Sequence, residues 1–156
     1  MLRAIDALQS DFLTPAQVAA SHAVMGLDRQ LVADGTYFIV EDGNEAAGCG
    51  GWSFRATTYG GDHSAGRDAR RLDPATEAAK VRAMYTDPAH VRRGVGRMVL
   101  NAAESAARES GFTAVELAAT MAGVPLYRAA GYVDVEAFED ASGGVPVPLI
   151  RMRKTL

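Results

Sequence analysis

Apolar and polar residues change their spacing along the chain, and these changes predict an order of helices and strands. Ala4–Phe12 has a helical pattern. A second helix is predicted after Thr14, because a threonine cap, a proline at the first helical position and a glutamine three residues after the cap are typical of a helix start. Asp28 can cap a short third helix that ends at Gly35. The front of the chain is therefore predicted to be helical.

Runs of β-branched, aromatic and small residues then indicate strands. Thr36–Glu41 and Ala46–Phe54 are joined by Asp42-Gly43-Asn44, a sequence typical of an antiparallel hairpin. Val81–Thr86 alternates as a third strand, which Asp87-Pro88 ends. Further strands are predicted over Ala114–Ala118, Tyr132–Phe138 and Leu149–Arg153.

An amphipathic helix is predicted after the third strand, from Gly94 to about Ser110. Its apolar stripe is Val95, Val99, Ala102, Ala103 and Ala106, and its solvent side is Arg97, Asn101, Glu104 and Arg108. A shorter helix, Pro125–Ala130, ends at Gly131. The order α-β-β-β-α-β-α-β-β predicts a mixed α/β fold, with a central mixed sheet of about six strands flanked by helices.

Composition limits the class of protein. A chain of 156 residues, 48% apolar and 22% charged, is predicted to form a single domain over residues 1–156. The net charge of −3 gives no reason to expect nucleic acid or an anionic membrane as a partner. Cys49 is the only cysteine, which excludes an internal disulfide, leaves no cluster for a metal and fits a reducing compartment. With no apolar run near the roughly 20 residues of a membrane helix and no signal-peptide core, a soluble cytoplasmic protein is expected.

The candidate binding chemistry lies where the third strand gives way to the long helix. Gly94 and Gly96 leave backbone N–H groups bare beside the positive end of a helix dipole, which is the arrangement of an anion site. Three arginines add positive charge: Arg92, Arg93 and Arg97. Spacing alone equally allows a glycine-eased turn with a solvated basic rim. A Walker A loop is excluded because no Lys-Ser/Thr follows the last glycine, and the dinucleotide fingerprint because Val99 stands at the place of its third glycine.

Three segments of the sequence together form a set of motifs. They are Met84-Tyr85-Thr86-Asp87-Pro88, Arg92-Arg93-Gly94-Val95-Gly96-Arg97 and Pro125-Leu126-Tyr127-Arg128-Ala129-Ala130-Gly131-Tyr132. Together they resemble the GNAT superfamily of acetyl-CoA-dependent N-acetyltransferases, most strongly over the segment 81–133, which would bind the cofactor. The resemblance implies a GNAT-like fold. Family members commonly begin with a strand before the first helix, and Met1-Leu2-Arg3 is too short for one, so that strand is expected to be missing or the start codon internal.

The resemblance also implies the cofactor contacts. In the family, Arg/Gln-x-x-Gly-x-Gly/Ala binds the pyrophosphate of coenzyme A through backbone amides; here Val91 stands where Arg/Gln is commonest. Family strands splay apart after the position of Met84–Thr86, whereas propensity alone predicts a fully paired core strand there. Many relatives carry asparagine where Thr120 stands. The residues implied to bind the cofactor are Met84, Tyr85, Thr86, Arg92, Arg93, Gly94, Val95, Gly96, Arg97 and Thr120.

Tyr127 carries the catalytic role that the resemblance implies. A phenol with a pKa of about 10 is protonated at neutral pH and can donate its proton to a leaving thiolate. Without the motif around it, Tyr127 would be interpreted as an ordinary core aromatic on a helix.

No residue identifies itself as a general base. The candidates are Asp62, His63, Asp73, Glu77 or a water chain, although the three histidines, His22, His63 and His90, are more simply interpreted as surface residues. The loop Thr57–Arg71, within the long connection Arg55–Ala79, is expected to recognise the acceptor. Trp52 and Phe54 either wall the acceptor pocket or fill the core.

The function expected from these observations is an acetyl-CoA-dependent N-acetyltransferase without a metal, which moves an acetyl group to the amine of a small molecule by direct attack in a ternary complex. A peptide or protein amine as acceptor, and a non-catalytic acetyl-CoA sensor, are the alternatives. A nucleic-acid patch built on the arginines is a third interpretation, which the acidic net charge disfavours. Because many relatives pair, a homodimer is expected.

Overall fold

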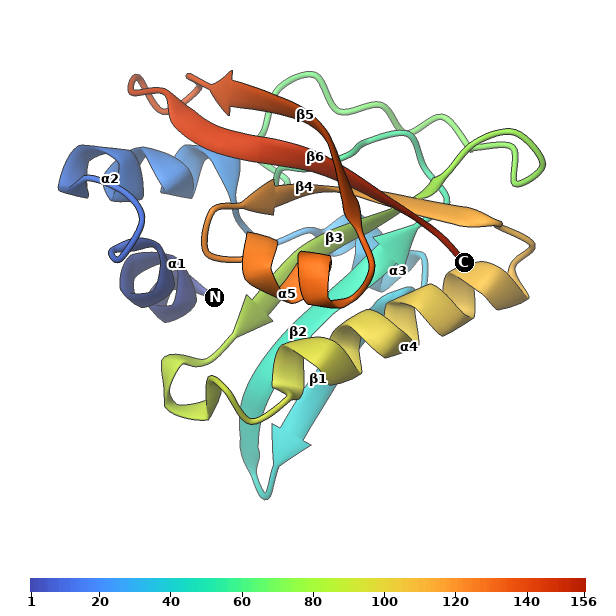
Figure 1. The fold of residues 1–156 in the computed structure, drawn as a ribbon, viewed down its shortest axis with the longest axis horizontal. Coiled ribbons are helices and arrows are strands. Elements are labelled where there is room, and N and C mark those ends of the chain that lie inside the picture. Colours follow the sequence, from blue (N-terminus) through green and yellow to red (C-terminus); the bar gives the residue numbers. More distant parts are fainter.

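The computed structural model describes residues 1–156 and contains one six-stranded sheet with helices on both sides (Figure 1). The helices are α1 (Leu2–Gln9), α2 (Pro15–Val24), α3 (Arg29–Ala33), α4 (Val95–Glu109) and α5 (Val124–Ala129), with a short 3-10 helix η1 (Pro88–His90). The strands are β1 (Tyr37–Asp42), β2 (Glu45–Ser53), β3 (Ala79–Thr86), β4 (Ala114–Thr120), β5 (Val133–Asp140) and β6 (Val147–Thr155). The predicted α/β class and order of elements are confirmed, and no strand precedes α1.

The sheet is mixed, in the order β1-β2-β3-β4-β6-β5, and β3 with β4 is its parallel pair. Figure 1 shows α4 and α5 in front of this sheet and α3 behind it, while α1 and α2 lie together at one end. None of the helices is long and apolar enough to cross a membrane.

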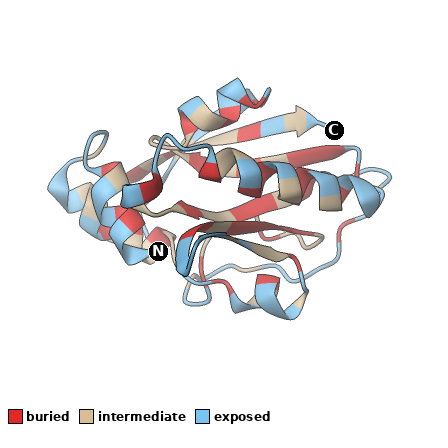
Figure 2. Ribbon diagram, turned by 90° about the horizontal axis from the view of Figure 1, so that it is seen from below, coloured by how far each residue is buried: buried red, intermediate tan, exposed pale blue.

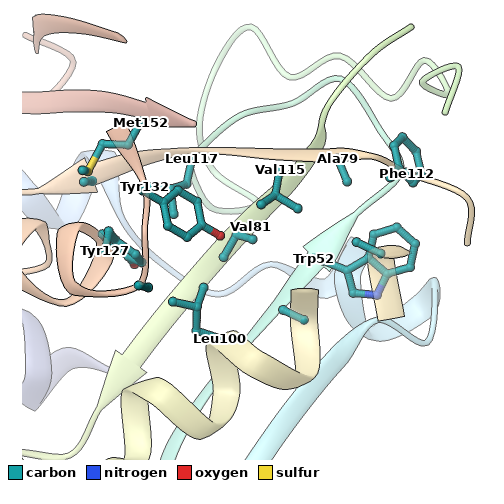
Figure 3. Packing of buried hydrophobic residues seen from close by; sticks show 14 of the residues in the cluster. Trp52, Ala79, Val81, Leu100, Phe112, Val115, Leu117, Tyr127, Tyr132 and Met152 are labelled. Carbon is teal, nitrogen blue, oxygen red and sulfur yellow. The ribbon is translucent and has the colours of Figure 1, made fainter. Parts of the chain in front are cut away.

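The largest hydrophobic cluster fills the space between the sheet and the two helices α4 and α5. Figure 3 shows Leu100 of α4 near Val81 of β3, and Tyr127 of α5 beside Tyr132. Figure 2 shows the same layering as buried residues on the strands and on the inner side of α4. Trp52 belongs to this cluster and Phe54 packs against it, so both fill the core.

The N-termini of the early helices follow the sequence signals. Thr14 Oγ1 accepts a hydrogen bond from the Gln17 N–H at 3.3 Å, and Gln17 Oε1 accepts one from the Thr14 N–H at 3.1 Å. This reciprocal capping box satisfies two donors that a helix start otherwise leaves unpaired. Asp28 caps α3 by accepting from the Gln30 N–H at 3.2 Å.

Helix α4 is amphipathic, with one error in the predicted solvent side. Val95, Val99 and Ala103 are buried as expected, but Glu104 is only 6% exposed. Lys154 of β6 places Nζ 2.5 Å from Glu104 Oε2, and this ion pair compensates the buried carboxylate. The partner lies fifty residues along the chain, so helical periodicity could not indicate it.

Glycines on β2 bring the start of α4 close to the sheet. A Cβ atom at Gly48 would lie 2.4 Å from Val95 Cγ1 and 2.9 Å from the Tyr85 carbonyl oxygen. One at Gly50 would lie 2.5 Å from Met84 Sδ and 3.0 Å from Val99 Cγ1. These two positions therefore set how near the N-terminus of α4 comes to β2 and β3.

We expect Gly48→Ala to lower the free energy of unfolding by about 2 kcal/mol, because the added methyl group overpacks the contact between β2 and α4. Urea denaturation measures the change. Val95→Ala removes the side-chain atom that the new methyl group meets, so the double variant should be less destabilised than the sum of the two single variants. If the changes in the free energy of unfolding were strictly additive, the methyl group added at position 48 would not clash with the Val95 side chain.

Candidate active site

A cleft opens where β3 and β4 separate. The two strands pair only at Ala79 with Val115 and at Lys80 with Glu116, and beyond these positions they diverge (Figure 1). The family resemblance implied strands that splay apart after Met84–Thr86; β3 and β4 do splay apart, but they already separate after Lys80. The full pairing that propensity alone predicted is absent.

A β-bulge lies in β3 at the same place. The register with β2 passes from Cys49 opposite Tyr85 to Gly51 opposite Arg82, so Ala83 and Met84 together face one residue of β2. Ala83 has a φ of 52°, a conformation that costs energy for a residue with a side chain. A bulge leaves a backbone group outside the ladder and redirects the neighbouring side chains, so polar main-chain atoms of β3 are available at the cleft.

The cleft has a volume of about 630 Å³ and is lined by elements from across the chain. Of the residues predicted to contact a cofactor or act in catalysis, all but Arg93 line it. They are Met84, Tyr85, Thr86, Arg92, Gly94, Val95, Gly96, Arg97, Thr120 and Tyr127. The Arg93 guanidinium instead lies 3.0 Å from Asp42 at the β1–β2 hairpin.

The start of α4 presents free backbone donors to this cleft. Gly94 is the N-cap residue with a φ of 83°, and no side chain caps the helix. The N–H groups of Val95, Gly96 and Arg97 have no acceptor in the protein, since the first helical bond in this turn runs from Met98 N–H to the Gly94 carbonyl oxygen. Unpaired N–H groups at the positive end of a helix dipole attract an anion.

Gly96 keeps space open in front of these donors. A Cβ atom there would lie 3.0 Å from Leu126 Cδ2 and 3.5 Å from Thr86 Oγ1, both on cleft-lining residues. Positive charge surrounds the same point: Arg92 is exposed, and Arg97 donates from Nη2 to the Ala129 carbonyl oxygen at 2.8 Å. The turn from Arg92 to Arg97 thus has the room, the donors and the charge to hold a phosphate group.

Tyr127 lies in the wall of the cleft. The residue is 7% exposed, and its ring meets that of Tyr132 edge-on at 5.7 Å between centroids (Figure 3). Burial raises the pKa of the Tyr127 hydroxyl above its ordinary value, and the nearby Tyr85 adds to the shift. The hydroxyl therefore stays protonated at neutral pH.

Tyr85 is held differently. Its hydroxyl accepts from the Gly26 N–H at 3.0 Å and donates to the Gly26 carbonyl oxygen at 3.1 Å. Burial raises its pKa to about 12. Because its hydroxyl both accepts from and donates to the backbone of Gly26, Tyr85 connects β3 to the segment after α2.

None of the four candidate bases lines the cleft. Asp62 binds Arg29, chiefly through a side-chain hydrogen bond that lowers the carboxyl pKa. Arg70 likewise holds the pKa of Glu77 at about 2. Asp73 accepts from the Ala75 N–H, and His63 Nε2 lies 3.0 Å from the Ala23 carbonyl oxygen. The loop that carries them reaches the cleft only through Thr58, Tyr59 and Gly60.

Sequence reasoning missed one wall of the cleft. Helix α1 and the segment after it contribute Ala4, Leu8, Gln9, Asp11 and Phe12, and the end of α2 contributes Val24, Met25 and Gly26. His90, predicted at the surface, is buried and also lines the cleft. No local motif marks these residues, because the helical pattern of Ala4–Phe12 does not indicate which part of the fold that helix packs against.

Comparison with known proteins shows similarity to acetyltransferases. Residues 3–132 match the model of the Acetyltransferase (GNAT) family. A GCN5-related N-acetyltransferase from Rhodopseudomonas palustris superposes with a TM-score of 0.72 at 18% identity, over 99% of this chain and 84% of that one.

Two other solved structures have a similar fold. YncA of Salmonella typhimurium, determined with its cofactor acetyl-CoA, gives a TM-score of 0.60 at 17% identity over 82% of this chain and 69% of that one. The ribosomal-protein-alanine N-acetyltransferase of Brucella melitensis gives 0.61 at 16% identity over 82% and 74%. No curated protein sequence matches the chain.

Proposed function

Because the chain belongs to the GNAT family of acetyltransferases, we propose that it transfers the acetyl group of acetyl-CoA to the amine of a small molecule. The observation that carries this proposal is the row of unpaired N–H groups at the start of α4, in one cleft with the hydroxyl of Tyr127. The acetyl-CoA held by the Salmonella relative supports the choice of cosubstrate. In this proposal residues 1–156 act as one catalytic domain.

The turn from Arg92 to Arg97 fits the diphosphate of coenzyme A. The N–H groups of Val95, Gly96 and Arg97 would donate to phosphate oxygens, and the helix dipole favours the negative charge. Gly96 leaves room for the phosphate, and Arg92 adds charge at the rim. Bound there, the cosubstrate supplies an acetyl group activated as a thioester.

The bulge in β3 would hold the acetyl group. Negative charge develops on a thioester carbonyl oxygen during acyl transfer, and a backbone N–H fixed in position stabilises it without reorganising. Ala83 and Met84 lie outside the regular ladder beside the gap to β4, which supports this role for their main chain. The side chain of Tyr85 is already engaged with Gly26.

Tyr127 would protonate the departing sulfur. As the bond from amine nitrogen to carbonyl carbon forms and the carbon–sulfur bond breaks, the nitrogen loses one proton and the sulfur gains one from the Tyr127 hydroxyl. The proton from nitrogen passes through water and restores the neutral tyrosine. A raised pKa keeps the hydroxyl protonated until the sulfur needs it.

The geometry favours a small acceptor. The cleft of about 630 Å³ must hold the end of the cosubstrate and the acceptor together. Helix α1 and the segment Thr58–Gly60 both contribute to its walls, so an acceptor in the cleft would meet side chains from both. The name of the Brucella relative keeps a peptide amine as the second candidate.

The test is an assay of free thiol with acetyl-CoA and a panel of small amines, with mass spectrometry of the products. We expect thiol release that depends on the amine, with an N-acetylated product in equal amount. Binding of acetyl-CoA without amine-dependent release would indicate a sensor. Acetylation of peptides but of no small amine would show that the acceptor is a peptide and not a small molecule.

A further inference from the structure

The part of the cleft lined by α1, by the end of α2 and by β3 has polar groups of its own, separate from the turn at α4. We call this region the acceptor end and define it by Leu8, Gln9, Phe12, Met25, Tyr59 and Arg82. Apolar side chains predominate in it. Its inner polar groups are the guanidinium of Arg82 and the carboxamide of Gln9.

Arg82 is a buried cation in the wall of the acceptor end. Its side chain is 2% exposed, and Nη2 lies 2.6 Å from Asp28 Oδ2 and donates to the Gly60 carbonyl oxygen at 2.9 Å. Its Nε–H has no hydrogen-bond partner. Burial lowers the pKa of Arg82 to about 10 even though Asp28 opposes the shift. A buried donor left unpaired is costly, and an anionic group is its best partner.

Neither carboxylate near Arg82 is bound by Arg82 alone. Asp28 is fully buried and is shared, because Arg67 also donates to its Oδ1 at 2.8 Å. The other carboxylate facing Arg82 is Asp62, which Arg29 already binds at 2.6 Å. Asp28 therefore serves two guanidinium groups, and one of them, that of Arg82, belongs to a residue that lines the cleft.

Gln9 offers the complementary group. The residue is 3% exposed, its Oε1 has no hydrogen-bond partner, and its Nε2 reaches only the Met25 sulfur at 3.8 Å. A carboxamide oxygen accepts from an N–H without being basic enough to take its proton. The acceptor end thus combines an unpaired donor on a cation with an unpaired neutral acceptor.

We propose that the acceptor is an aminocarboxylate: a small amine that carries a carboxylate, bound by Arg82, on an otherwise apolar body that packs against Leu8, Phe12 and Met25. The proposal rests on the acetyltransferase function proposed above and names its substrate class. Gln9 Oε1 accepts from the N–H of the amine. Asp11, the exposed carboxylate at the opening, attracts the ammonium form that arrives from solution.

The test compares substrates that differ only in the carboxylate, with the unaltered enzyme. Leucine is paired with leucinamide and isoamylamine, and δ-aminovalerate with n-butylamine, so that short and long spacings between the amine and carboxylate are both sampled. Rates are compared as kcat/KM for the neutral amine, taken from pH profiles. We expect at least one aminocarboxylate to exceed its decarboxylated partner by about 100-fold, because an ionic hydrogen bond is lost with the carboxylate.

Equal values for each pair would overturn the aminocarboxylate while leaving acetyl transfer to small amines intact. Failure of every small amine would overturn the proposed function and this inference together.

Arg82→Lys then tests the residue itself. Lysine keeps the charge opposite Asp28 but lacks the Nε–H fork, so the preference for the aminocarboxylate should fall at least tenfold while the affinity for acetyl-CoA is unchanged. If Arg82 were purely structural, Arg82→Lys would instead lower kcat/KM equally for both members of each pair, and that result would contradict the assignment. Unchanged affinity for acetyl-CoA shows that the variant is folded. Gln9→Met is the matched variant for the amine: it should raise KM for all acceptors without changing the carboxylate preference.

Discussion

Tyr127→Phe is expected to lower kcat about 100-fold with little change in the affinity for acetyl-CoA. Without a positioned acid, the sulfur must leave as an unprotonated thiolate. Phenylalanine keeps the ring, so the edge contact with Tyr132 and the packing of α5 persist. Burial raises the pKa of Tyr127, so the unaltered enzyme should show no loss of activity from ionisation of this group as the pH rises through the range in which free phenols titrate. Steady-state kinetics over a pH series measure both effects.

Tyr132→Phe is the matched control. Tyr132 is buried beside Tyr127 and does not line the cleft, so loss of its hydroxyl should leave kcat close to that of the unaltered enzyme. If the two variants have the same kcat, the role of Tyr127 is packing rather than acid catalysis.

Gly96→Val is expected to weaken acetyl-CoA binding about 100-fold, which corresponds to the loss of one or two hydrogen bonds to a charged group. The new side chain would project toward Leu126 and Thr86, into the space in front of the unpaired N–H groups. Fluorescence or calorimetric titration gives the Kd.

Asn101→Val controls for the change in helix propensity, since Asn101 is exposed on the same helix away from the cleft. It should bind acetyl-CoA as the unaltered protein does. An unchanged Kd for Gly96→Val would show that the diphosphate does not bind at the start of α4.

The sequence predicted the elements well because their signals are local. The capping box at Thr14, the hairpin turn at Asp42-Gly43-Asn44 and the period of α4 each lie within a few residues. The half of the cleft proposed to bind the cofactor could also be predicted from the sequence, because one continuous segment, 81–133, supplies both the turn and Tyr127.

The acceptor half depends on distant pairings, and no local pattern encodes these. Arg82 sits in an alternating strand like any polar residue, and only the folded chain brings Asp28 and Gly60 to it. Glu77 was a reasonable base by residue type, but Arg70 neutralises it seven residues away in the same loop. The burial of His90 and Glu104 has the same origin in contacts made across the fold.

Calorimetric titration with acetyl-CoA and with S-acetylpantetheine, which keeps the thioester and lacks the diphosphate, measures how much of the affinity depends on the diphosphate. We expect one site per chain for acetyl-CoA and an affinity for S-acetylpantetheine at least about 100-fold weaker, because most binding energy comes from main-chain donors at the start of α4. Equal affinities, or no heat with acetyl-CoA, would contradict it.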